Sequence, residues 1–151
     1  MLYTSPEGDI ECFSDEAEVP EGWQPLIRHI DLWNHNVEFI EQEEAWPRPA
    51  VFIEFAPIDW SHDLKAYGDY RGSGGINLHI VTDWQGSTSH DSPLRDSGLH
   101  AFDILESVVN SVVALEGPDY GPLIHARSLT NHDHEDIVEN IESFTFKCYR
   151  P

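Results

Sequence analysis

The chain has 151 residues and is strongly acidic, with 28 Asp and Glu against eight Lys and Arg and a formal net charge of −20. Its length fits one domain that buries about two-thirds of the surface exposed by the unfolded chain. A free-standing nucleic-acid-binding protein carries a basic surface that neutralises phosphates, and no segment here supplies one. The charge also argues against binding to an anionic membrane surface.

The residues give no sign of secretion, of a disulfide framework or of membrane insertion. Cys12 and Cys148 lie far apart in the sequence, and we expect both to be free thiols. No positively charged start is followed by an apolar core, so no signal peptide is expected. The longest apolar stretches, residues 50–55 and 108–115, are too short to span a bilayer.

Residues 1–25 are predicted to form an acidic arm, separate from a folded body of residues 26–151. The arm contains seven acidic residues and no basic residue, and it lacks a clear periodicity. We expect extended or irregular structure that is either ordered against a neighbour or mobile.

The body is predicted to begin with two strands that pair antiparallel. In residues 50–58 and 76–81, apolar side chains recur at every second position, which is typical of β-strands. The polar, glycine-containing loop between them is longer than an ordinary hairpin loop. Asn77 and His79 lie on the face of the second strand opposite its apolar residues, and we interpret His79 as a surface or interface side chain.

A long helix and two more strands complete the predicted body. Apolar residues at three- and four-residue spacing indicate a helix over residues 95–115. Strands are expected at residues 123–129 and 137–149, which gives the order β-β-α-β-β. We therefore predict an α+β fold: an antiparallel sheet of about four main strands, with one long helix packed on one face and a long loop between the first two strands.

No group of residues predicts a catalytic site or a cofactor. The segment from His132 through His134 to Asp136 is the strongest metal candidate, since imidazole and carboxylate both bind divalent metals. It lacks the spacing of known zinc or calcium motifs, and we interpret it as a solvated turn. There is no nucleophile elbow of the GxSxG type. We expect no catalytic, cofactor-binding or metal-binding residues; a metal-dependent hydrolase centred on this segment is the least favoured alternative.

The best candidate for a binding surface is the long loop between the first two body strands. It combines aromatic residues with cationic ones, and Trp, Tyr and Arg are favoured at interface hot spots. The residues predicted to form a subunit contact are Trp60, Lys65, Tyr67, Tyr70 and Arg71. The alternative is a mobile loop whose aromatic side chains fold back on the core.

Several segments between residues 26 and 150 resemble small tail-completion proteins that prophages encode. The segments that carry the resemblance are RHIDLWN at 28–34, WPRPAVFIEF at 46–55, the Arg71-Gly72 loop, the strand at 76–81, AFDIL at 101–105, Pro122-Leu123 and FTF at 144–146. These proteins resemble the tail terminator family of long-tailed phages, which join head to tail. The resemblance implies a small α+β fold with no enzymatic residues. Residues 1–25 depart from it, because such proteins commonly begin with a helix.

The resemblance implies a structural virion protein. Copies of the chain would form a ring, often hexameric, at the head-proximal end of the tail tube, where the ring stops tube growth and joins tail to head. The implied partners are the tail tube protein and head–tail connector or neck proteins, with assembly in the host cytoplasm and a final place in the virion. DNA would pass through without specific binding, since acidic residues repel phosphate. The alternative function is an acidic module that binds a basic partner as a DNA mimic does.

Overall fold

The computed structural model describes residues 1–14, 16–35, 46–62, 70–84, 86–131 and 133–150. These residues form one helix and nine strands. In chain order the elements are β1 (Leu2–Thr4), β2 (Ile10–Cys12), β3 (Gln24–Pro25), β4 (His29–Leu32), β5 (Ala50–Phe55), β6 (Asp59–His62), β7 (Tyr70–Asp83), α1 (Arg95–Val112), β8 (Ile124–Asn131) and β9 (Ile137–Arg150).

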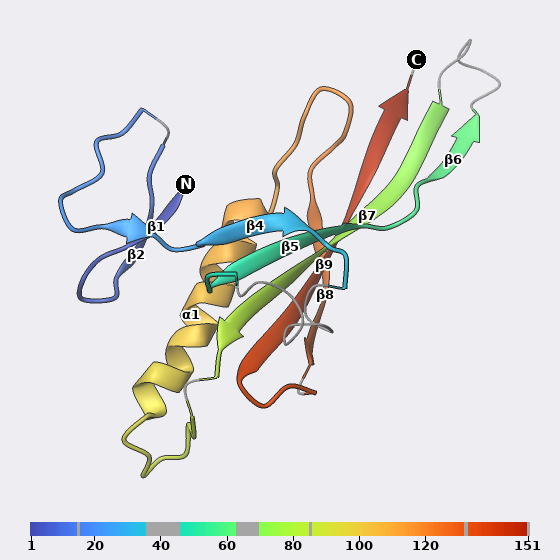
Figure 1. Cartoon of the computed structure of the whole chain (residues 1–151). Coiled ribbons are helices and arrows are strands. Elements are labelled where there is room, and N and C mark those ends of the chain that lie inside the picture. Colours follow the sequence, from blue (N-terminus) through green and yellow to red (C-terminus); the bar gives the residue numbers. More distant parts are fainter. Residues whose placement is uncertain (15, 36–45, 63–69, 85, 132, 151) are drawn as a thin grey trace.

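Six of the strands form one mixed sheet, the main sheet. Its order is β4-β5-β7-β9-β8, and β6 also pairs with β7. β4 runs parallel to β5, and all the other pairs are antiparallel. β7 and β9 have 14 residues each and pair along their whole length, which corresponds to about 46 Å. They extend well past β5, and with β6 they form a projecting end of the molecule (Figure 1).

The predicted fold class is wrong. The chain is mostly β-structure, with a six-stranded mixed sheet and a second sheet of three strands, where the sequence predicted one antiparallel sheet of about four strands covered by a long helix. The strands β1 to β4 have only two to four residues each, which is too short for a period-2 pattern to stand out. The parallel pairing of β4 with β5 leaves no local signal in the sequence.

The long loop predicted between the first two body strands is partly strand. β6 and the first residues of β7 occupy its ends. Three of the glycines that suggested a loop, Gly72, Gly74 and Gly75, lie inside β7, where atoms of neighbouring segments occupy the space beside them. A Cβ atom on Gly72 would lie 2.5 Å from the Cys148 sulfur and 2.9 Å from Ile58. Glycine here permits close packing within a strand.

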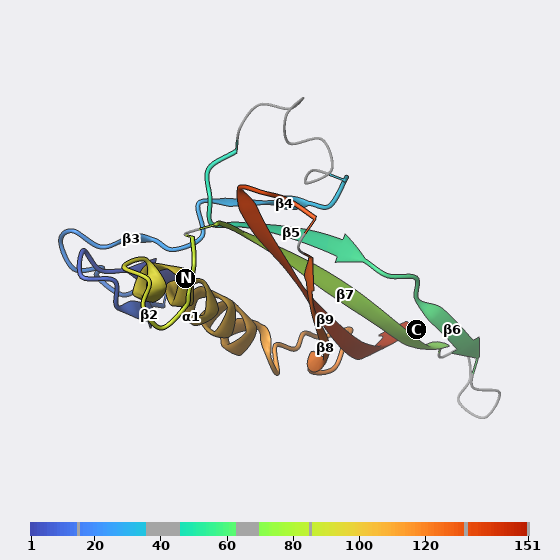
Figure 2. The ribbon, with the colours of Figure 1, turned by 90° about the horizontal axis from the view of Figure 1, so that it is seen from below.

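The predicted arm contains the three short strands of the second sheet, in the order β2-β1-β3. Three aromatic rings of this segment pack in T-shaped pairs. The ring centroids of Tyr3 and Phe13 are 5.7 Å apart, and those of Phe13 and Trp23 are 5.4 Å apart. Leu2 packs against the core of the main sheet. Both views show this small sheet beside α1, at the end of the molecule opposite β6 (Figures 1 and 2).

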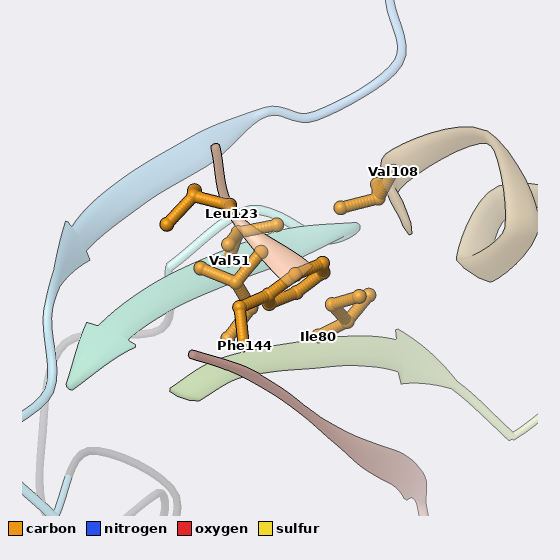
Figure 3. Close-up of a cluster of buried hydrophobic side chains, with 6 residues drawn as sticks. Val51, Ile80, Val108, Leu123 and Phe144 are labelled. Carbon is orange, nitrogen blue, oxygen red and sulfur yellow. The ribbon is translucent and has the colours of Figure 1, made fainter. Parts of the chain in front are cut away.

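The core lies on both faces of the main sheet. On the face toward α1, the helix face, the buried cluster is Val51, Leu78, Ile80, Val108, Leu123 and Phe144, most of which Figure 3 labels. On the opposite face, the polar face, the buried cluster is Trp46, Ala50, Phe52, Val81 and Ile137. The helix ends at Val112, earlier than predicted, because Ala114 adopts a φ of 65° and donates its N–H to the carbonyl of Leu123.

Two phenylalanines on the helix face test the position of the core. Phe144 is 1 % exposed, whereas Phe55 is 68 % exposed. We expect Phe144→Ala to lower the free energy of unfolding by about 3–5 kcal/mol and Phe55→Ala to change it by no more than about 0.5 kcal/mol. Urea denaturation at a protein concentration that keeps the chain monomeric measures both. Equal losses in the two variants would contradict this placement of the core.

Candidate assembly surface

Part of the helix face carries exposed apolar side chains. The five residues are Ile30 (64 % exposed), Leu32 (59 %), Phe55 (68 %), Ile58 (39 %) and Trp60 (45 %). We call them the apolar strip. No other described element covers this strip, although α1 and the N-terminal sheet lie against the same side of the main sheet (Figure 2).

The strand registers place the strip on one face. Ile30 and Leu32 of β4 pair with Val51 and Ile53 of β5, both of which belong to the helix-face core or pack against it. Phe55 pairs with Ile76, which packs against the same core. Paired residues in a sheet point to the same side, so these apolar side chains share one face.

Ile58 and Trp60 continue the strip toward the projecting end. They pack over Gly72, where a Cβ atom would lie 2.9 Å from Ile58 and 3.0 Å from the Trp60 ring. Beside them is a hollow of about 590 Å³ whose lining includes the aromatic residues Trp60, Tyr120 and Phe146 together with Asp119 and Arg150. Exposed aromatic side chains next to a hollow are typical of the centre of a protein–protein interface.

The five residues predicted for a subunit contact are only partly described. Trp60 and Tyr70 are 45 % and 43 % exposed. Trp60 pairs with Gly72, and Tyr70 lies two residues before Gly72 in β7, so both are on the helix face. Arg71 is exposed and lies on the polar face. Lys65 and Tyr67 lie outside the described residues. The subunit contact therefore remains a prediction for all five.

The sequence did not indicate Ile30, Leu32 or Phe55 as surface residues. Their alternation with polar neighbours predicts a strand with a buried face. Whether such a face is covered depends on where the helix lies, and no local pattern contains that information. The sequence therefore does not indicate that these three side chains are exposed.

The polar face holds a buried group of charged side chains around His79, which is only 4 % exposed. Its Nδ1 lies 2.7 Å from Glu139 Oε1, and its Nε2 lies 3.3 Å from Glu54 Oε2. The ring stacks on Trp33 with a centroid distance of 3.7 Å. The interpretation of His79 as a surface or interface side chain is therefore wrong, since Trp33 covers the ring within the same chain and a carboxylate lies at each of its two nitrogens.

Hydrogen bonds lower the pKa values of the two carboxylates. The pKa of Glu54 is lowered mainly by the hydrogen bond that the amide of Asn77 donates at 2.6 Å, with a smaller contribution from His79. Burial is the largest single influence on Glu139 and raises its pKa. The hydrogen bonds from His79 and Asn131, together with the charge of His79, outweigh burial, so the pKa of Glu139 is lowered overall. The folded state thus favours ionised Glu139.

A second buried carboxylate lies on the helix face. Glu142 is 1 % exposed, and its Oε2 lies 2.6 Å from His125 Nε2 and 2.6 Å from the Ser128 hydroxyl, which donates to it. The same hydroxyl lies 3.3 Å from His125 Nε2. A catalytic triad needs the hydroxyl and the carboxylate on opposite nitrogens of the imidazole ring. Here both contact one nitrogen, so the three residues form a hydrogen-bonded polar group and do not form a relay.

The predicted metal candidate is incompletely described, because His132 lies outside the described residues. His134 is half-buried, and Asp133, Glu135 and Asp136 are exposed. In the described part of the chain, no group of three or more His, Cys, Asp or Glu side chains is arranged to hold a metal ion. Nor do the described residues include a helix of the length and apolar character needed to cross a membrane.

Comparison with known proteins gives no family. No protein-family model matches the chain, and no curated protein matches it. Among solved structures, the chain is similar to a chain from the virion of a native gene transfer agent (GTA) particle, with 11 % sequence identity and a TM-score of 0.48 over 82 % of this chain and 79 % of the other. At these values the two folds cannot be equated.

The lowered pKa of Glu139 predicts a loss of stability in acid. The ordinary pKa is 4.5 and the folded-state value lies below it, so the stabilisation is complete above pH 4.5 and is lost as the pH falls through the folded-state pKa. We expect Glu139→Gln to be about 1.5–3 kcal/mol less stable than the wild type at pH 7, and the difference to shrink below pH 4.5.

Urea denaturation of both proteins between pH 3 and pH 7 measures this difference. Acidification also reduces the repulsion among the many carboxylates, but it does so almost equally in the two proteins and cancels in the comparison. A difference that stays constant over the whole range would show that Glu139 is not held ionised by its neighbours.

Proposed function

We propose that the chain is a structural virion protein, a tail terminator or a closely related neck component, whose copies form a ring at the head-proximal end of a phage tail tube. The resemblance of residues 26–150 to tail-completion proteins supports this role. The observation that carries it is the apolar strip, in which five large apolar side chains are 39–68 % exposed on one face of a chain with a net charge of −20.

Contact between copies is the simplest use of this strip. A contiguous exposed apolar surface marks an interaction site in most soluble proteins. Complete burial of five half-exposed side chains would contribute about 5 kcal/mol. The opposing repulsion between copies is screened beyond about 8 Å at physiological salt, whereas burial of apolar side chains at the contact is not screened. Burial of the apolar strip between copies therefore opposes the repulsion between their charges.

The position of the strip favours a ring over a two-fold dimer. The strip runs from the edge strand β4 along β5 to β6 at the projecting end (Figure 1), so it lies along one side of an elongated molecule. If this side contacts a different surface of the next copy, the contact is heterologous. Repeated from copy to copy, such a contact forms a closed ring when the rotation from one copy to the next divides evenly into a full turn. The carboxylates that face the opening of such a ring would keep DNA phosphates from binding.

The first test is the assembly state. We expect the wild type to give a ring-sized species in native mass spectrometry and closed rings in electron micrographs. Leu32→Asp with Phe55→Asp should leave folded monomers, since each carboxylate would be buried without a partner. The matched control is Phe102→Asp, because Phe102 is 60 % exposed on α1, away from the strip; this variant should still form rings.

The second test addresses the place of the ring in the tail. Added to polymerising tube protein of the same phage or prophage, the wild type should stop tube growth and cap one end, and the Leu32→Asp, Phe55→Asp variant should not. A wild type that stays monomeric at high concentration and binds basic proteins, with an affinity that collapses in salt, would instead establish the acidic binding module.

A further inference from the structure

We infer that copies of this chain join edge to edge, with β8 of one copy paired antiparallel to β4 of the next, so that the main sheets of neighbouring copies continue into one another. The inference rests on the proposed self-association and adds the backbone contact that joins the copies. The apolar strip begins with Ile30 and Leu32 on β4, so it adjoins this junction.

The two strands are the outer edges of the main sheet. β4 and β8 stand at opposite ends of its strand order, and Figure 2 shows them on either side of β5, β7 and β9. In the described part of the chain, β4 pairs only with β5 and β8 pairs only with β9. The outward N–H and C=O groups of such edge strands are a template for pairing with another chain.

Neither edge has the features by which proteins commonly block this pairing. Proline, lysine and β-bulges are frequent on protected edges, and neither strand contains Pro or Lys. The one irregularity of β8 lies near its start, between His125 and Arg127. The five residues that follow it, 127–131, pair regularly with β9. This stretch is long enough to pair with β4, which has four residues.

The strand directions favour pairing of β8 with β4. β4 is parallel to β5, whereas the next three pairs, from β5 through β7 and β9 to β8, are all antiparallel. β8 therefore runs opposite to β4. When successive copies share one orientation, β8 of one copy meets β4 of the next as an antiparallel pair, which is the more stable kind. The pairing repeats from copy to copy and leaves no free edge in a closed ring.

The edge at β8 is free of negative charge. Residues 121–131 contain no Asp or Glu, although the chain has 28 of them. Arg127 is exposed and lies on the polar face, where it pairs with Ser143 and has Ile141 and Thr145 as its diagonal neighbours on β9. No described carboxylate forms an ion pair with Arg127. A negative charge on the next copy would therefore be its first acidic partner.

The edge at β4 supplies that negative charge on the same face. Asp31 pairs with Phe52, which belongs to the polar-face core, and its side chain is 60 % exposed. Its contact with His29 is a weak one, at 4.0 Å. In a continuous sheet the polar faces of the two copies coincide, so Asp31 can lie opposite Arg127. Opposite charges on facing strands stabilise the pair and help to fix its register.

Other arrangements of these edges are less favourable. Pairing of β8 with β8 about a two-fold axis would bring two copies of Arg127 together, and pairing of β4 with β4 would do the same with Asp31. An extended segment of a different protein would occupy one edge and leave the other open. Pairing of β4 with β8 uses both edges and brings opposite charges together, which favours a second copy as the partner.

A charge exchange at the junction tests the inference. Asp31→Arg and Arg127→Asp, made singly, each place like charges opposite one another, and we expect either change to lower the association constant about tenfold. The double variant should assemble like the wild type, because its opposite charges face each other again and its net charge is unchanged. Native mass spectrometry over a range of concentrations measures the ring-sized species.

The matched controls are Glu106→Arg and Arg95→Asp. They change the net charge as the two single variants do, but both positions are exposed on α1, and they should assemble like the wild type. A double variant as weak as the single ones, single variants that assemble normally, or controls that fail as badly as the single variants would each overturn the inference and leave the ring proposal standing.

A disulfide across the junction tests the pairing itself. Within one chain, β4 and β8 are four strand spacings apart, about 19 Å, and a disulfide joins Cα atoms within about 7 Å. In a Cys12→Ser background, Asp31→Cys with Arg127→Cys should therefore link different copies, and oxidation should give covalent multimers on a non-reducing gel. Asp31→Cys with Glu106→Cys should not give them.

Two outcomes of the disulfide experiment separate this inference from the ring proposal. Rings that give no covalent multimers on oxidation would overturn the pairing of β4 with β8 alone. A folded wild type that stays monomeric at high concentration would overturn both.

Discussion

The pairing of β7 with β9 is the interaction on which the rest of the structure depends. This antiparallel ladder of 14 residue pairs is the centre of the main sheet. Two residues of the ladder, Leu78 and Phe144, belong to the core on the helix face. Val81 and Ile137 belong to the core on the polar face. The His79–Glu139 contact joins the same two strands. The far end of the ladder belongs to the projecting end of the molecule, so the same two strands pass from the core to the end of the apolar strip (Figure 1).

The buried acidic residues show how the chain tolerates its charge. Glu139 and Glu142 lie three residues apart in β9 and point to opposite faces of the main sheet, and they are only 3 % and 1 % exposed. Each is in contact with a histidine and at least one hydrogen-bond donor from a neighbouring strand. Burying an unpaired carboxylate is costly, so these contacts also fix which strands lie next to β9. Residues 1–25, in contrast, keep their carboxylates exposed, where water solvates them.

The sequence was a good guide where one element could be recognised from its own residues. The strands β5 and β9 and most of α1 follow from apolar spacing, because each buries one continuous stripe. It failed where the structure depends on contacts between distant segments. Gly72 suggests a loop until Cys148 is placed beside it, and Ile30 suggests a core position until the helix proves to lie elsewhere. His79 suggests a surface residue because nothing near it in the sequence indicates that Trp33 covers it. The candidate site was missed for the same reason: exposure is a property of the whole fold.

The projecting end differs physically from the body of the protein. In the body, α1 packs on one side of the main sheet and Trp46 with its neighbours packs on the other. At the projecting end, the Tyr120 ring packs on Phe146 of β9 with a centroid distance of 6.1 Å, and neither α1 nor the Trp46 cluster reaches this part of the sheet. Strands without a full second layer bury little apolar surface and are marginally stable alone. The glycines of β7 offset part of this deficit by letting Ile58, Trp60 and Cys148 pack directly on the backbone. Aromatic surface stays exposed at this end, and the proposed contact between copies would bury it.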